Sequence, residues 1–222
     1  MALAGGHRPH PRAIVFDLDR SLIDSRNAWR YCIEESVAAA TGRRIDASPL
    51  IDEYHLRPWR DALAILAPTA ELAGRCCELC ETMYERSAMK KLLVHEGIGM
   101  ALDALRGERI EIGAVSRLPH GLAVKQVQST GLDRFVAVLS ATPRGQLWRP
   151  RDRFEACLAF RDSPPGDSAY ISGDGHDLAE VAPSGAVLFA ASWAHGTEID
   201  DGIPAPGAMH HAIMSTWAQR ST

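Results

Sequence analysis

Four polar residues from distant parts of the chain each come at the end of a short apolar run. Asp17 and Asp19 end AIVFDLD, Ser116 ends EIGAVS, and Asp174 follows AYISG. These runs are typical of strands buried on both faces of a parallel sheet, where ligands bind outside the carboxyl ends of the strands. We therefore expect three carboxylates to meet at one edge of a sheet. They would raise one another's pKa unless a cation neutralised them, and a hard ion such as Mg²⁺ prefers oxygen ligands.

An Asp-x-Asp pair also has a simpler interpretation, as a solvated loop or a helix cap. Here the pair ends a buried strand and precedes SLIDS, which leads into a helix. A second Gly-Asp follows another buried strand, in ISGDGHD. This context favours a site that performs chemistry.

The elements that must position these residues are five apolar runs separated by helix-like stretches. The runs are 13–19, 111–116, 135–140, 169–173 and 186–192. The helix-like stretches among the last four are 119–130, 151–160 and 177–182. Alternating β and α units of this kind predict an α/β fold with a doubly wound, Rossmann-like parallel sheet.

The long interval between the first and second runs has helical patterns and no convincing strand. Leu72, Cys76, Leu79 and Met83 recur at the spacing of one helix face. A parallel crossover needs only about a dozen residues, so most of this interval is surplus to the sheet. We expect residues 26–90 to form an inserted helical cap, and residues 1–25 and 91–222 to form the α/β core.

The motifs resemble those of the haloacid dehalogenase superfamily, in particular its phosphoglycolate-phosphatase-like branch with a helical cap. That branch commonly begins with FDLDGTLxDS, and this chain has FDLDRSLIDS from Phe16 to Ser25. The second motif, a strand ending in Ser or Thr, is matched by IGAVS at Ser116. WRPRDRF puts Arg149 at the position of the third motif's lysine, and Gly173 with Asp174 match the fourth. The likeness covers residues 13–25 and about 95–220.

The resemblance implies a role for each matching residue. Asp17 would be the nucleophile that forms an aspartyl-phosphate, and Asp19 would protonate the leaving oxygen and then activate water. Asp17, Asp174 and the backbone carbonyl of Asp19 would hold Mg²⁺. Ser116 would donate to a phosphoryl oxygen, and Arg149 would offset the charge on nucleophile and phosphate.

Several positions depart from the family pattern. Arg20 stands where glycine is usual, Arg149 replaces lysine, and Asp177 comes one residue early, so that it either touches the metal shell or orients neighbouring backbone. Arg20 and Arg117 are candidate substrate contacts.

The expected cap carries a polar and aromatic cluster that reads either as substrate recognition or as ordinary surface charge. It comprises Tyr54, His55, Arg57 and Arg60, of which the two arginines are further substrate candidates. His176 is expected to be a loop histidine, because Mg²⁺ prefers oxygen, and His195 is a candidate for closing the pocket.

The function favoured by these residues is Mg²⁺-dependent hydrolysis of a small phosphate monoester. A phosphomutase of the same fold uses the same two aspartates, and a catalytically quiet member that binds a phosphorylated ligand is the third alternative. Dehalogenation is disfavoured, since those relatives need neither a metal nor Asp19 in this role.

Composition restricts the class of partner. The 222 residues are 46% hydrophobic and 23% charged, with a formal net charge of −4 and no block of like charges. These values exclude the basic footprint of a nucleic-acid or anionic-membrane binder, so we expect a small phosphorylated metabolite as the partner. The N-terminal segment lacks a secretory pattern and the five cysteines lack framework spacing, so we expect a cytoplasmic protein with Cys77 and Cys80 packed in a core. The sequence leaves the oligomeric state open.

Overall fold

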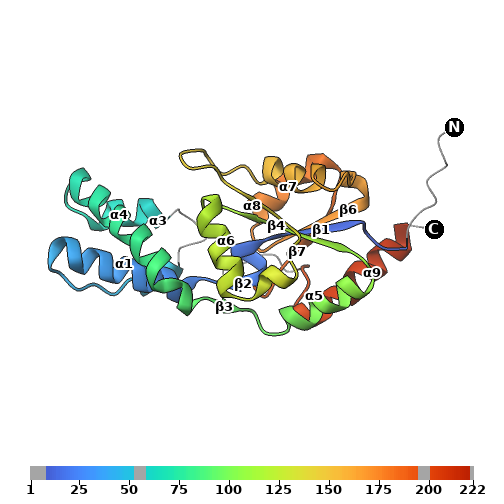
Figure 1. The fold of residues 1–222 in the computed structure, drawn as a ribbon, viewed down its shortest axis with the longest axis horizontal. Helices are drawn as coiled ribbons and strands as arrows, with labels where there is room; N and C mark the ends of the chain where they lie inside the picture. The colour runs from blue at the N-terminus through green and yellow to red at the C-terminus, as the bar shows by residue number, and fades with distance from the viewer. Residues whose placement is uncertain (1–8, 53–58, 195–200, 221–222) are drawn as a thin grey trace.

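The computed structural model describes residues 9–52, 59–194 and 201–220, with the side chains of residues 52 and 59–62 excepted. A five-stranded, all-parallel sheet lies at the centre of the larger part of the molecule (Figure 1). Its strands, in the spatial order β5-β4-β1-β6-β7, are Val138–Ala141, Glu111–Ser116, Ala13–Asp17, Ser168–Ser172 and Val187–Ala190. The predicted doubly wound sheet is confirmed.

Two layers of helices cover the sheet. The helices beside the sheet are α5 Ile98–Gly107, α6 His120–Ser129, α7 Pro150–Ala159, α8 Gly175–Val181 and α9 Met209–Arg220. Short helical turns follow several strands and helices: η1 Leu18–Leu22, η2 Ala88–Lys91, η3 Leu132–Arg134, η4 Pro165–Asp167, η5 Ala182–Ser184 and η6 Pro206–Ala208.

Side-chain alternation along β1 divides the core between these layers. Ala13 and Val15 pack in a cluster with residues of α7 and α8, whereas Ile14 and Phe16 belong to the cluster formed with α5, α6 and α9. Successive side chains of a strand point to opposite faces, so an apolar run without polar alternation is the expected pattern for a strand covered on both sides. The next residue in this alternation, Asp17, is a carboxylate at the end of the buried strand.

The expected strand at 135–140 begins later than its apolar pattern suggests. Phe135 and Val136 both donate their backbone N–H groups to the carbonyl of Leu132, so they close turn η3 before β5 starts at Val138. The prediction is therefore wrong for residues 135–137. Turn hydrogen bonds occupy the N–H groups of Phe135 and Val136, whereas the N–H of Ala137 already donates to the carbonyl of Ile112 on β4 at 2.8 Å.

The interval after β1 forms a separate group of helices, here called the insertion helices. They are α1 Arg26–Thr41, α2 Ser48–Asp52, α3 Trp59–Leu66 and α4 Ala70–Arg86. Figure 1 shows α1, α3 and α4 beside one another and to one side of the sheet. A short antiparallel pair, β2 Ile23–Asp24 and β3 Leu93–Val94, joins the start and the end of this segment. The prediction of no strand in this interval is wrong at the pair, because two residues are too few to produce a periodic signal.

Apolar packing joins the insertion helices to the core. Trp29 of α1 stacks on Tyr84 of α4 with ring centroids 4.2 Å apart, and both side chains are buried. The same hydrophobic cluster continues to the strand residues Ile14 and Phe16. Cys80 is buried and Cys77 half-buried on α4, as core packing predicts. None of the helices within the described residues is both long and apolar enough to span a bilayer.

Candidate active site

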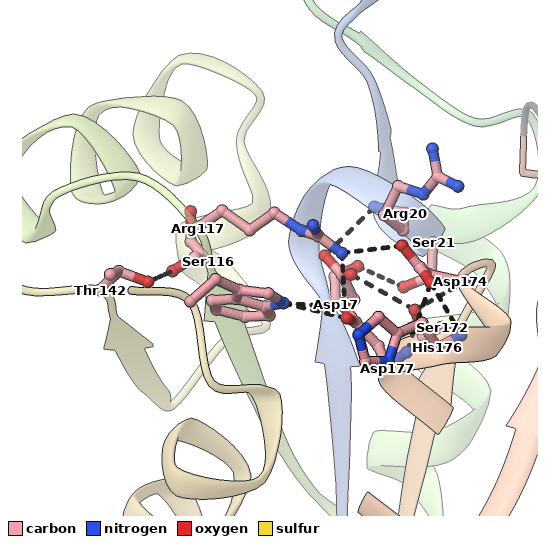
Figure 2. A network of polar contacts seen from close by, with 11 residues as sticks. Asp17, Arg20, Ser21, Ser116, Arg117, Thr142, Ser172, Asp174, His176 and Asp177 are labelled. Carbon is pink, nitrogen blue, oxygen red and sulfur yellow. Dashed lines mark hydrogen bonds and ion pairs between the residues drawn. The ribbon is translucent and has the colours of Figure 1, made fainter. Parts of the chain in front are cut away.

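Asp17 lies at the carboxyl end of the central strand, where side chains from three neighbouring segments converge (Figure 2). Its side chain is fully buried. The chain leaves β1 through turn η1, which brings the backbone N–H of Arg20 to 3.3 Å from Asp17 Oδ1. The hydroxyl of Ser172, at the end of β6, lies 3.3 Å from Asp17 Oδ2. Each carboxylate oxygen of Asp17 is thus held by a donor from a different segment.

The surroundings of Asp17 disfavour its charged form. Burial raises the pKa of this carboxyl well above its usual range, and the nearby carboxylate of Asp177 raises it further. Arg117 opposes both effects, and Asp19 and Arg20 make smaller contributions of opposite sign. The ionisation of Asp17 therefore depends on the positive charge gathered around it.

Asp174 and Asp177 form the acidic pair on the other side of this edge. Asp174 caps helix α8, because its Oδ1 accepts the backbone N–H groups of His176 at 3.0 Å and Asp177 at 3.3 Å. Asp177 is buried, and its Oδ1 accepts the indole N–H of Trp148 at 3.0 Å. The early position of Asp177 thus places its carboxylate against Trp148 rather than in an open loop. His176 is exposed, as expected, but it lies in the first turn of α8 rather than in a loop, because the Asp174 cap accepts its backbone N–H and starts the helix there.

Arg117 supplies the positive charge in contact with this pair. Its Nη2 lies 2.9 Å from Asp174 Oδ2 and 2.8 Å from Asp177 Oδ2, and its guanidinium carbon lies 5.1 Å from the centre of the Trp148 ring. Figure 2 shows the side chain reaching from the end of β4 to the two carboxylates. Sequence reasoning gave Arg117 only a substrate contact and gave Trp148 no role.

Arg149, the residue expected to offset charge, has a different setting. It is exposed at the N-terminus of α7, and no hydrogen bond or ion pair among the described residues joins it to Asp17. The adjacent Trp148 enters the cluster instead. The role of Arg149 stays a prediction, and in this arrangement Arg117 is the arginine that contacts the carboxylates.

Asp19 takes part in a separate hydrogen-bond network that extends to the insertion helices. Its Oδ1 accepts the side-chain N–H of Gln126, on α6, at 3.1 Å, and the same amide nitrogen donates to the hydroxyl of Tyr84, on α4, at 2.6 Å. Burial raises the pKa of Asp19, while the hydrogen bonds from Gln126 and Ser25 oppose that rise. Gln126 and Tyr84 were missed from the sequence, where Gln126 is one polar residue in an amphipathic helix.

Arg20 and Ser116 complete the set of candidates that the structure describes. The Arg20 side chain is 7% exposed, its Nε lacks a hydrogen-bond partner, and Figure 2 shows its guanidinium directed away from the Asp174 and Asp177 carboxylates. The Ser116 hydroxyl is buried and accepts the backbone N–H of Leu118 at 3.1 Å, which leaves its own proton for donation.

Four further candidates cannot be placed. Tyr54, His55, Arg57 and His195 lie outside the described residues. Arg60 lies in α3, but its side chain is also outside the description. Their proposed contacts with substrate stay predictions.

The oxygen donors suit Mg²⁺ in type but not in their present arrangement. Carboxylates of Asp17 and Asp174 are the hard ligands that this ion takes. In the described part of the chain, however, no three acidic, histidine or cysteine side chains are grouped closely enough to hold a metal ion. The guanidinium of Arg117 lies against Asp174 where an ion would bind. One arginine side chain therefore offsets part of the negative charge of this site.

The fold is shared with solved structures of haloacid dehalogenase-like proteins. One is a haloacid dehalogenase superfamily hydrolase of subfamily IA from Geobacter sulfurreducens, with a TM-score of 0.73 and 16% identity over 96% of this chain and 100% of that one. Another is a "putative phosphoglycolate phosphatase" from Lactobacillus delbrueckii, with a TM-score of 0.73 and 16% identity over 92% and 98%.

A third is a "putative beta-phosphoglucomutase" from Thermotoga maritima, with a TM-score of 0.68 and 16% identity over 92% of this chain and 99% of that one. No protein-family model and no curated protein matches the sequence. At these identities the likeness shows the fold. The chain has the haloacid dehalogenase-like fold that the four sequence motifs predict.

Proposed function

We propose that this protein is a phosphatase that hydrolyses a small phosphate monoester through an aspartyl-phosphate on Asp17. The observation that carries the proposal is the placement of Asp17, a buried carboxylate at the end of the central strand, oriented by the Arg20 N–H and the Ser172 hydroxyl. A fixed carboxylate at the carboxyl edge of a parallel sheet is positioned to attack a ligand bound there.

In the first step a carboxylate oxygen of Asp17 forms a bond to phosphorus, and the bond from phosphorus to the leaving oxygen breaks. Asp19 gives that oxygen a proton. Burial favours this role, because it raises the pKa of Asp19 and so keeps the acid protonated over a wider pH range. Gln126 holds the Asp19 side chain in one orientation from the neighbouring helix.

In the second step water attacks phosphorus and the bond from phosphorus to Asp17 breaks. Asp19, now ionised, accepts the proton of that water, and inorganic phosphate leaves. Ser116 would donate its hydroxyl proton to a phosphoryl oxygen. In the metal-free protein the positive charge of Arg117 favours the ionised form of Asp17. Carboxylate oxygens of Asp17 and Asp174 would hold Mg²⁺, which would offset the negative charge on the phosphoryl group when bound.

The substrate would enter beside the insertion helices, which we propose form a cap over the site. The contact from Asp19 through Gln126 to Tyr84 supports this proposal, since it ties the catalytic acid to helix α4. A cap that closes would exclude bulk water and read the part of the substrate remote from phosphorus.

A screen for phosphate release tests the function. The wild-type protein is incubated with sugar phosphates, glycolate phosphate and nucleotides, each with and without Mg²⁺, alongside an Asp17→Asn variant. We expect hydrolysis of at least one small monoester by the wild type and a loss of at least about 10⁴-fold in the variant. Full activity in Asp17→Asn would refute the nucleophile.

Two further outcomes of the same screen correspond to the alternatives. Transfer of phosphate between positions of a sugar phosphate, without release, would identify a phosphomutase, which the Thermotoga maritima neighbour makes a specific alternative. Binding of a phosphorylated ligand without turnover would identify a catalytically quiet member.

A further inference from the structure

The acidic edge of the sheet carries its own cation. One nitrogen of Arg117, Nη2, contacts carboxylate oxygens of both Asp174 and Asp177, at 2.9 and 2.8 Å. The indole ring of Trp148 lies under the same guanidinium, and its N–H donates to Asp177. Arg117 is thus held by two charges and an aromatic face at the place where the fold brings its acidic side chains together.

Arg117 contacts Oδ2 of Asp174, the carboxylate oxygen that remains available to a ligand. Asp174 Oδ1 already accepts two backbone N–H groups, from His176 and Asp177, which fills its two lone pairs. Oδ2 is therefore the oxygen through which Asp174 would bind a metal ion. Arg117 Nη2 lies 2.9 Å from that same atom.

An ion and the guanidinium cannot share this position without strong repulsion. Mg²⁺ binds carboxylate oxygen at about 2.0–2.1 Å, so an ion on Asp174 Oδ2 would lie within a few ångströms of a second positive charge. The Arg117 side chain is 38% exposed, which gives it a path toward solvent. Binding of the ion therefore requires Arg117 to leave.

We propose that Arg117 is a tethered competitor for the divalent cation: it offsets part of the negative charge of Asp174 and Asp177 in the metal-free protein, and Mg²⁺ binds only by displacing it from Asp174 and from the face of Trp148. The proposed competition rests on the proposed function in one respect, namely that Asp174 is a metal ligand. The consequence is a protein whose Mg²⁺ affinity is weakened by one of its own side chains.

Calorimetric titration with Mg²⁺ alone tests the competition. The proteins compared are the wild type, Arg117→Met, which keeps an apolar stem over Trp148, Arg117→Ala, and the control Arg161→Ala. Arg161 matches Arg117 closely: it is 38% exposed, pairs with Glu111 at 3.3 Å and lies against the aromatic ring of Phe160. Glu111 starts β4, whereas Arg117 follows the end of the same strand, so the control removes the same charge at the opposite edge.

We expect both Arg117 variants to bind Mg²⁺ roughly ten- to a hundredfold more tightly than the wild type, the range given by a hydrogen bond to a charged group. Arg161→Ala should bind like the wild type. Equal affinities in the wild type and both Arg117 variants would overturn the proposal, as would the same gain in Arg161→Ala. Circular dichroism and thermal unfolding establish that each variant is folded.

Tryptophan fluorescence gives a second readout that does not depend on any variant at position 117. Displacement of Arg117 removes a cation from the face of Trp148, so Mg²⁺ should change the emission of the wild type and leave Trp148→Phe largely unchanged. An identical change in both proteins would contradict displacement. Phosphate release by the wild type, measured separately, tests the proposed function. If the wild type hydrolyses a phosphate monoester but the Arg117 variants bind Mg²⁺ no more tightly, only the competition is refuted. If the Arg117 variants bind Mg²⁺ more tightly but the wild type hydrolyses no monoester, only the phosphatase function is refuted.

Discussion

The two carboxyl groups of the segment Asp17-Leu18-Asp19 have different kinds of surroundings. The carboxylate of Asp177 repels the charged form of Asp17, and the positive charge of Arg117 is the largest effect that opposes this repulsion and the effect of burial. For Asp19, the neutral hydrogen-bond donors Gln126 and Ser25 lower the pKa more than the charges of Arg117 and Arg20 do. Burial raises the pKa of both groups. The difference lies in the group that opposes this rise most strongly, which is Arg117 for Asp17 and Gln126 for Asp19.

This difference teaches how one short segment can carry two chemical roles. A carboxylate whose ionisation is supported by a nearby arginine suits a nucleophile, which must be charged to attack. A buried carboxyl held by neutral donors suits an acid, which must first carry a proton. The partners of each aspartate, rather than its residue type, separate the roles, and variants that remove one partner at a time test the separation.

The largest contrast is expected between Asp19→Asn and Asp17→Asn. Asp19→Asn should slow release of phosphate from an alkyl phosphate by about 10²- to 10⁴-fold, because the leaving oxygen gets no proton. An aryl phosphate needs little protonation of its leaving group, so this variant should still be phosphorylated and should accumulate the adduct, detected by mass spectrometry of the intact protein.

Asp17→Asn is the matched control for that experiment. It should form no adduct with either substrate, since the attacking oxygen is missing. Adduct formation in Asp17→Asn, or unchanged turnover of alkyl phosphates by Asp19→Asn, would show that the two roles are assigned incorrectly.

A smaller effect is expected when the neutral partner of Asp19 is removed. Gln126→Ala deletes the hydrogen bond that lowers the pKa of Asp19, so the limb of the pH profile of kcat/KM that reports this group should move to higher pH. We expect kcat to fall by about tenfold, the scale of one hydrogen bond to a charged group, with KM nearly unchanged. Tyr84→Phe should shift both quantities in the same direction by less, because it removes only the anchor of Gln126.

Gln128→Ala is the control for position 126, as Gln128 is an exposed glutamine of the same helix. Its pH profile should match that of the wild type. An unshifted profile in Gln126→Ala would mean that Gln126 packs in the core without positioning Asp19.

The smallest effect concerns stability. Because burial raises the pKa of Asp17, the folded protein binds more protons than the unfolded chain between the usual aspartate pKa and the raised value, so the free energy of unfolding falls as pH rises through that window. The Asp17→Asn variant has no carboxyl at this position, so it does not lose this part of the free energy of unfolding as pH rises. Its thermal midpoint relative to the wild type should therefore increase with pH above about 4, by roughly 2–4 °C for each kcal/mol of charge strain relieved.

Thermal unfolding of both proteins at several pH values between 4 and 8 measures this difference. At the acid end the two midpoints should differ least, since pH 4 lies close to the usual aspartate pKa, where the wild type has lost only a small part of this free energy. A difference in midpoint that does not vary with pH would contradict a raised pKa for Asp17.

Local patterns in the sequence predicted the sheet and one edge of the site. Unbroken apolar runs are characteristic of strands covered on both faces, and polar residues at the ends of such runs must meet at the same edge of a parallel sheet. The runs ending at Asp17 and Ser116 therefore located the site before any packing was known. The pattern was less reliable at Phe135, where turn hydrogen bonds displaced the start of the strand.

The sequence by itself determined which acidic groups lie at the edge of the sheet, because periodicity along a strand decides which residue comes last. Only the tertiary structure decided their partners. Arg117 rather than Arg149 contacts the acidic pair, and Gln126, 107 residues from Asp19 in sequence, holds the second aspartate. Such pairings depend on how separate helices pack across the sheet and on the direction each long side chain takes, and neither is encoded in the spacing of residues within one element.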